Sequence, residues 1–105
     1  MIIEKEFNKF EELLSSIKLP VLADFYNDSC ESCLTMAPIL EELDAQMKKQ
    51  LQVVKINTDS YPELAAMHHI QVIPTLVLFK QGKPVDRIHG IMSAEALIQR
   101  LQALV

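Results

Sequence analysis

The sequence of 105 residues contains little glycine, no long apolar run and no excess of positive charge. Glycine occurs only at Gly82 and Gly90, which argues against a loop-rich fold. No apolar run approaches the roughly 18 residues that a membrane-spanning helix needs, so we expect no membrane partner. The formal net charge of −4 argues against a nucleic-acid partner, because positively charged surfaces recognise nucleic acids.

The N-terminus also lacks the pattern of a secretory signal. Residues 1–6 read MIIEKE, without a basic segment followed by roughly 7–15 apolar residues. We therefore expect a cytoplasmic protein. In such a reducing compartment, two neighbouring cysteines serve catalysis or metal binding more often than they form a permanent cross-link.

What is present is the composition of an ordinary globular protein, with 50% apolar and 23% charged residues. The length predicts a single domain over residues 1–105, because a chain of this size can bury a core without added cross-links. Apolar residues at helical spacing predict helices over residues 7–17, 31–48, 61–69 and 93–104. Short apolar runs predict strands over residues 21–27, 51–59, 75–80 and 85–90, and residues 1–6 are expected to add an edge strand.

The order of these elements predicts the fold class. Helices between the early strands favour parallel pairing with right-handed crossovers. A turn over residues 81–84 favours a terminal antiparallel hairpin. Together they predict an α/β fold with a single mixed β-sheet and helices on both faces. Ser93 is expected to cap the last helix.

Cys30 and Cys33 are the only cysteines, and they lie between a predicted buried strand and a predicted helix. A thiol at the start of a helix faces unpaired backbone N–H groups and the positive end of the helix dipole, and both lower its pKa from about 8.5. This placement favours a redox pair. Cys30 would attack a substrate disulfide, and Cys33 would release the mixed disulfide that results.

Two other interpretations of the cysteine pair stay open. A structural zinc site needs about four ligands, and only His68, His69 and His89 could complete one, without the usual ligand spacing; we therefore expect no metal. The pair could also be two buried apolar residues without chemistry. His68 and His69 end a predicted helix, where histidines are usually solvated, and we assign no chemistry to them. His89 is next to Gly90, which could bring it near the active site, but no motif supports a catalytic role for it.

Several segments extend the pattern beyond the cysteines: VLADFY, MAPILEEL, VVKINTD and VIPTLVLFKQGKPVDRIHG. With the C-x-x-C motif, they resemble the thioredoxin family over nearly the whole chain. The resemblance implies the thioredoxin fold and a monomeric thiol–disulfide oxidoreductase that reduces protein disulfides. It implies electrons from a thioredoxin-reductase-like donor and no bound cofactor besides the redox-active disulfide Cys30–Cys33.

The resemblance also implies a substrate-docking region around Pro74. This residue matches a proline that is cis in thioredoxins, and the backbone of Ile73 would pair with an extended substrate segment. Composition alone favours a trans proline at the start of a strand. Gly90 matches a glycine whose missing side chain leaves room for the substrate.

Three further residues gain roles from the resemblance. Asp24 matches a buried aspartate that assists deprotonation of the second thiol, since a buried carboxyl has a raised pKa and can exchange a proton near neutral pH. The alternative places Asp24 in water at a strand end. Lys55 matches a lysine that could partner it. Tyr26 stands where the family has tryptophan, with core packing as the alternative to a role in binding.

The active-site motif departs from the family's Trp-Cys-Gly-Pro-Cys. Ser29 removes a large aromatic from the docking face, although a helix cap or a turn would also explain it, with Asp28 as a competing cap. Ser32 replaces the proline, which is associated with a more oxidising couple. Glu31 disfavours a thiolate beside it, yet it suits the first turn of a helix.

These departures predict a changed choice of partner. Leu34 stands where many relatives have a basic residue, so the rim of the site is less cationic and less aromatic than in the family. We expect an altered preference for the substrate or the reductase. The alternative function is a redox-inactive binding module or adaptor that uses the same fold.

Overall fold

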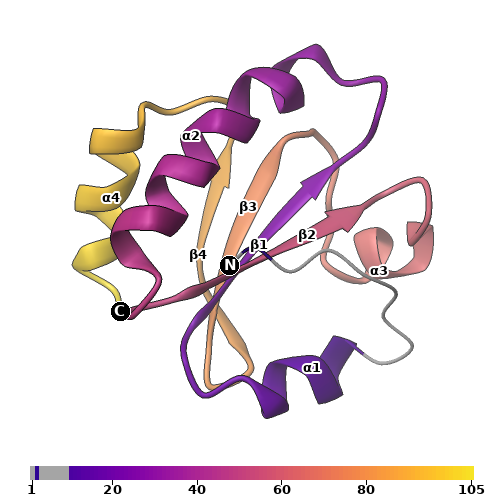
Figure 1. Cartoon of the computed structure of the whole chain (residues 1–105). Helices are drawn as coiled ribbons and strands as arrows, with labels where there is room; N and C mark the ends of the chain where they lie inside the picture. Colours follow the sequence, from indigo (N-terminus) through magenta and orange to yellow (C-terminus); the bar gives the residue numbers. More distant parts are fainter. Residues whose placement is uncertain (1, 3–9) are drawn as a thin grey trace.

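The computed structural model describes residue 2 and residues 10–105 (Figure 1). The predicted edge strand over residues 1–6, apart from residue 2, and the start of the first predicted helix lie outside this part. None of the described helices is long and apolar enough to cross a membrane. The elements in chain order are α1 (Phe10–Ser16), β1 (Val21–Tyr26), α2 (Glu31–Met47), β2 (Gln52–Asn57), α3 (Pro62–Met67), β3 (Thr75–Lys80), β4 (Lys83–His89) and α4 (Ala94–Gln102).

The four described strands form one mixed sheet in the order β2-β1-β3-β4, as the predicted fold class requires. β1 and β2 are parallel, whereas β3 is antiparallel to β1 although a helix precedes it. The expectation of parallel pairing is therefore wrong for β3. The reason is that the connection from β2 to β3, which contains the six-residue α3, does not cross back along the sheet before β3 begins. β3 consequently starts at the end of the sheet where β2 stops, which is the end that also carries Cys30.

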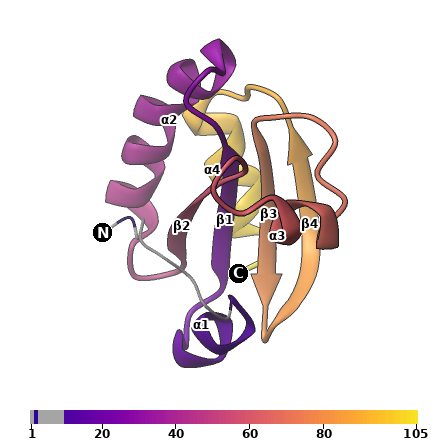
Figure 2. The ribbon, with the colours of Figure 1, turned by 90° about the vertical axis from the view of Figure 1, so that its right-hand side faces the viewer.

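Helices cover both faces of the sheet. α2 and α4 lie on one face and α1 and α3 on the other, which is clearest in Figure 2. Successive residues of β1 alternate between the two resulting cores: Leu22 joins the α2/α4 core, and its neighbours Val21 and Ala23 join the α1/α3 core. β1 is therefore buried on both sides, which explains its nearly continuous apolar sequence.

The hairpin between β3 and β4 is tighter than predicted. Its turn consists of Gln81 and Gly82, with φ of 55° and 80°, which matches the two positive φ values of a two-residue hairpin turn. Lys83 and Pro84 belong to β4 and not to the turn. A proline is tolerated there because β4 is an edge strand, and the register shifts next to it, between Leu78 and Phe79.

The start of α4 agrees with the prediction. Ser93 is the N-cap, and its Oγ accepts a hydrogen bond from the backbone N–H of Ala96 at 3.2 Å. The bond satisfies one of the N–H groups that the first turn of a helix leaves without an intrahelical partner.

Candidate functional site

The cysteine pair lies at the beginning of α2, just beyond the end of β1 (Figure 1). Cys30 and Cys33 form a disulfide, with their Cα atoms 5.2 Å apart. Cys30 is also the N-cap of α2, because its Sγ accepts a hydrogen bond from the backbone N–H of Cys33 at 3.0 Å. Capping by Ser29 or Asp28 is therefore wrong. Ser29 has a turn role instead, since its N–H donates to Oδ1 of Asn27 at 3.0 Å.

The two sulfurs differ in accessibility. Cys33 is 9% exposed, whereas Cys30 is half-buried at the edge of the helix. After reduction, the N–H that now reaches Cys30 Sγ would stabilise a thiolate on that atom, together with the helix dipole. The arrangement gives one reachable, stabilised sulfur with a second, shielded sulfur within bonding distance.

The Pro74 loop borders the same edge of the sheet. The Ile73–Pro74 peptide bond is cis, which confirms the expectation from the family and not the one from composition. The carbonyl of Pro74 accepts a hydrogen bond from the N–H of Gly90 at 2.9 Å. Gly90 has a φ of 78°, which few residues other than glycine adopt, and apart from Gly90 and its two chain neighbours no described residue has an atom within 4 Å of where its Cβ would be. Open space therefore adjoins Gly90.

Asp24 lies beneath this edge, on β1. It is 4% exposed, so the buried placement is confirmed and the water-exposed alternative is wrong. Its register partner on β2 is Lys55, and the alternation along β1 directs Asp24 to the same face as Leu22, which is the α2 face. The Nζ of Lys55 lies 4.4 Å from the centroid of the Tyr26 ring, a cation–π contact at the end of β1.

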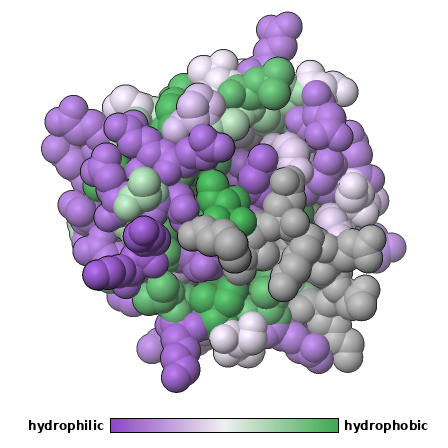
Figure 3. All heavy atoms as spheres, in the orientation of Figure 1, coloured by the Kyte–Doolittle hydropathy of each residue, from purple (hydrophilic) through white to green (hydrophobic). Residues whose placement is uncertain are grey.

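The rim of the site combines exposed polar residues with exposed apolar ones. Ser29, Glu31 and Ser32 are exposed around the disulfide. Leu34 is 70% exposed in the first turns of α2, where Figure 3 shows apolar atoms at the surface, at the top of the view. Val72 and Ile91, which flank Pro74 and Gly90 in sequence, are 53% and 50% exposed. Large apolar side chains therefore reach solvent on both sides of the site.

Two residues that sequence reasoning passed over hold the loops of the site. The Oδ1 of Asn57 accepts the N–H of Asp59 at 2.9 Å, and its Nδ2 donates to Oδ2 of Asp28 at 3.4 Å, which joins the loops after β2 and before Cys30. Thr75 is fully buried, and its hydroxyl donates to the carbonyl of Val72 at 2.6 Å. The sequence did contain a signal for both: each is a polar residue at one end of a buried apolar run.

His68 is not solvated, contrary to the expectation. It is half-buried on the α1/α3 face, with its ring centroid 5.3 Å from that of Phe79 and 5.7 Å from that of Phe10. Burial lowers the pKa of His68 below its ordinary 6.5, the positive charge of Arg87 and then His69 lower it further, and Glu11 opposes the shift. His69, by contrast, is exposed as expected.

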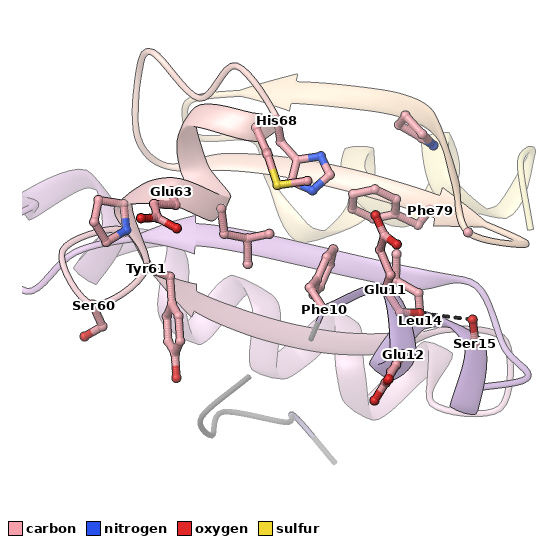
Figure 4. A pocket seen from close by; sticks show the side chains of 15 residues that line it. Phe10, Glu11, Glu12, Leu14, Ser15, Ser60, Tyr61, Glu63, His68 and Phe79 are labelled. Carbon is pink, nitrogen blue, oxygen red and sulfur yellow. Dashed lines mark hydrogen bonds between the residues drawn. The ribbon is translucent and has the colours of Figure 1, made fainter. Parts of the chain in front are cut away.

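A hollow of about 850 Å³ lies beside His68, between α1 and α3 (Figure 4). Its walls include the apolar Phe10 and Phe79, and acidic side chains such as Glu11 and Glu63 lie at it. None of the residues predicted for the cysteine site lines this hollow. The hollow and the disulfide are therefore separate features of the molecule. In the described part of the chain, no group of three or more histidine, cysteine or acidic residues could hold a metal ion.

A disulfide at the start of a helix, at the same end of a mixed sheet as a cis proline, is typical of one class: small α/β proteins that carry out thiol–disulfide exchange. The comparisons with known proteins agree. The chain belongs to the thioredoxin family, since the family model described as Thioredoxin matches residues 1–103. Membership together with the cysteine pair indicates thiol–disulfide exchange as the general chemistry.

Three relatives illustrate this similarity. A thioredoxin-like protein of Synechocystis sp. is 50% identical over 105 residues, which is all of both chains. Thioredoxin Y1, chloroplastic, of Arabidopsis thaliana is 43% identical over 94% of this chain and 58% of its own length. A bifunctional thioredoxin reductase/thioredoxin of Mycobacterium leprae is 42% identical over 91% of this chain but only 21% of its own length.

Proposed function

We propose that the protein is a thiol–disulfide oxidoreductase that reduces protein disulfides through Cys30 and Cys33. The observation that supports this best is the position of Cys30, half-buried at the N-cap of α2 with a backbone N–H at 3.0 Å from its sulfur. This position favours a thiolate at neutral pH, which is the form of cysteine that attacks disulfides.

The proposed cycle begins with both cysteines reduced. The thiolate of Cys30 attacks one sulfur of a substrate disulfide, and the other substrate sulfur leaves as a thiolate that takes up a proton. The Cys33 thiol loses its proton and attacks Sγ of Cys30. This step breaks the mixed disulfide, releases the second substrate thiol and forms the Cys30–Cys33 disulfide. Two electrons have then passed from the cysteine pair to the substrate.

We assign the proton of Cys33 to Asp24. Asp24 is buried on the α2 face of β1, and burial disfavours the charged form of a carboxyl, so that it can take up a proton near neutral pH. Lys55 would support the transfer from the register position opposite Asp24 on β2. Its cation–π contact with Tyr26 holds the ammonium group near the end of β1.

Substrate would dock along the Pro74 loop. The backbone of Ile73 would pair with an extended segment of the substrate, and the open space beside Gly90 would admit the chain. Four further side chains would complete the contacts around the disulfide without taking part in the reaction: Tyr26, Ser29, Glu31 and Ser32.

The partners follow from this cycle. Electrons would come from a thioredoxin-reductase-like donor. The Mycobacterium leprae relative supports this proposal, because its name joins a thioredoxin reductase and a thioredoxin in that one protein. The exposed Leu34 argues for a changed preference of reductase, and normal reduction by a standard thioredoxin reductase would contradict that part. We further propose a monomer that needs no bound cofactor and works in the cytoplasm. Cell fractionation tests the last point, since one relative is named chloroplastic.

Reduction of insulin by dithiothreitol tests the proposal. Wild type should accelerate the precipitation of the released insulin chain, and Cys30→Ser should abolish the acceleration. Reduced Cys33→Ser, mixed with insulin after removal of dithiothreitol, should accumulate a mixed disulfide visible on a non-reducing gel, because Cys30 attacks and no second thiol releases it. An unchanged rate on addition of wild type would refute the proposed activity.

The exposed apolar rim supports a second candidate, a binding module without turnover. Leu34, Val72 and Ile91 give the site contact area that does not depend on redox chemistry. This candidate predicts that a variant with both cysteines changed to serine retains its cellular partners. Loss of all partners in that variant, together with insulin reduction by wild type, would exclude it.

A further inference from the structure

His89, the last residue of β4, lies next to the Pro74 loop without a role in the cycle. It pairs in register with Thr75, the first residue of β3, and its Nδ1 lies 3.3 Å from Thr75 Oγ1. The same Oγ1 lies 2.6 Å from the carbonyl oxygen of Val72. One hydroxyl therefore contacts both a carbonyl oxygen and an imidazole nitrogen.

The proton count of these three groups fixes the tautomer of His89. A hydroxyl has one proton, and a carbonyl oxygen has none to give. At 2.6 Å the proton of Thr75 must point to the Val72 carbonyl, so Oγ1 can only accept at its contact with His89. Nδ1 of His89 must then carry a hydrogen. In the neutral ring, this leaves Nε2 as a hydrogen-bond acceptor.

The position of this acceptor matters for docking. His89 is exposed, and Nε2 lies on the side of the ring opposite Nδ1, which faces β3. Gly90 follows His89 directly and donates its N–H to Pro74, so the two residues border the docking loop from β4. Val72, whose carbonyl Thr75 holds, begins the same loop. The imidazole that carries this acceptor is therefore attached where β4 meets the docking loop.

We propose that His89 determines substrate specificity by accepting, at Nε2, a hydrogen bond from an N–H or O–H donor of the docked segment. Thr75 acts as its positioning residue. The substrates selected would be disulfide-bearing polypeptides with such a donor beside the segment that lies against Ile73 and Pro74. The docking part of this inference rests on the proposed function, whereas the tautomer does not.

The tautomer is tested by nitrogen-15 NMR of the imidazole rings in the oxidised protein, at a pH about two units above the ordinary histidine pKa of about 6.5. His89 should show a protonated Nδ1 and an unprotonated Nε2. Thr75→Ser should keep this pattern, and Thr75→Val should lose it because the acceptor is gone. A protonated Nε2 in wild type would overturn the proposal.

The specificity is tested by steady-state reduction of insulin with three variants. His89→Asn keeps an N–H near the position of Nδ1 but has no acceptor at Nε2, and should raise KM about fivefold with kcat unchanged. His89→Gln reaches the position of Nε2 with its amide oxygen and should recover most of the wild-type KM. The control His69→Asn makes the same change at an exposed histidine that has no assigned contact with substrate, and it should have no effect.

The two measurements separate the possible failures. If wild type does not reduce insulin, the docking part falls with the proposed function, and the NMR still decides the tautomer. If wild type is active and His89→Asn keeps the wild-type KM, the specificity role is wrong while the proposed function stands. Because His89 is exposed, we expect the variants to fold, and circular dichroism verifies this.

Discussion

The two faces of the sheet are built from different side chains. Among the described residues, the core under α2 and α4 contains leucine, isoleucine, valine and methionine and no aromatic residue. The core under α1 and α3 contains Phe10, Phe25 and Phe79, with His68 packed among their rings. The buried carboxyl of Asp24, which we propose takes part in the reaction, faces the first core. The half-buried His68 faces the second core.

This difference follows from the helices that each face must hold. α2 has 17 residues and crosses the sheet, so many aliphatic contacts along its length secure it. α3 has only six residues, too few for a helix to persist without tertiary contacts. Large aromatic rings stabilise such short helices because each ring buries much apolar area. The cysteine pair and Asp24 thus lie on the face that the long helix α2 covers.

Neighbouring residues of β3 provide the strongest test of this contrast. Phe79 belongs to the α1/α3 core and Leu78 to the α2/α4 core. Phe79→Ala should destabilise the protein by about 3–5 kcal/mol and Leu78→Ala by about 2–5 kcal/mol, measured by urea unfolding. Hydrogen exchange should show lost protection in α1 and α3 for the first variant and in α2 and α4 for the second. Equal loss in all four helices would contradict the division into two cores.

A second test asks whether the buried carboxyl is chemical or structural. Asp24→Asn should slow insulin reduction about hundredfold, the lower range for a general acid–base group. Its stability should not fall, because the amide avoids the cost of burying a charge. Asp59→Asn makes the same change of carboxylate to amide and is the matched control, since Asp59 is exposed in the loop after β2. Equal rates for the two variants would remove Asp24 from the mechanism.

The third prediction concerns pH and the aromatic face. The pKa of folded His68 is lowered from 6.5, first by burial, so the unfolded chain binds more protons as the pH falls below about 6.5. The stability that neutral His68 provides is therefore complete above pH 6.5 and is lost as the pH falls toward the folded pKa. Urea unfolding of wild type and His68→Phe should differ in this window.

The control for the histidine is His69→Gln, at the exposed neighbour. It should leave the pH dependence as in wild type. A wild-type stability that stays constant between neutral pH and the folded pKa of His68, or a dependence that survives in His68→Phe, would show that another group is responsible.

The smallest effect is expected for an ion pair that joins β4 to α4. The Nη2 of Arg100 lies 2.7 Å from Oδ1 of Asp86, with both side chains partly exposed, so Arg100→Ala should cost at most about 1 kcal/mol at neutral pH. The hydrogen bond from Arg100 lowers the pKa of Asp86 below 3.8. The contribution is present above pH 3.8 and is lost as the pH falls through the folded pKa. An Arg100→Ala cost that persists at lower pH would contradict this origin.

Much of the fold was predictable because its signals are local. Helical spacing identified the described helices to within about two residues in α2 and α4, and Ser93 marked the start of α4. The apolar run around Asp24 predicted a buried strand and hence a buried carboxyl, as observed. The resemblance supplied the cis bond at Pro74, which composition alone had assigned the other way.

The failures concern contacts between segments distant in sequence. The direction of β3 depends on where the short α3 releases the chain. His68 is half-buried because Phe10 of α1 and Phe79 of β3 pack against its ring. Both residues are distant in sequence, so the residues next to His68 do not predict these contacts. The cap at Cys30, instead of Ser29 or Asp28, depends on how the loop leaves β1.

By itself, the sequence determined the alternation of strands and helices, the order of the elements and the C-x-x-C pair at a helix start, because periodicity and capping act over a few residues. Only the tertiary structure decided that β3 runs antiparallel to β1, and that one hydroxyl of Thr75 contacts both the carbonyl of Val72 and the imidazole of His89. The physical reason is that hydrogen bonds between strands depend on register, and register follows from the packing of the whole sheet.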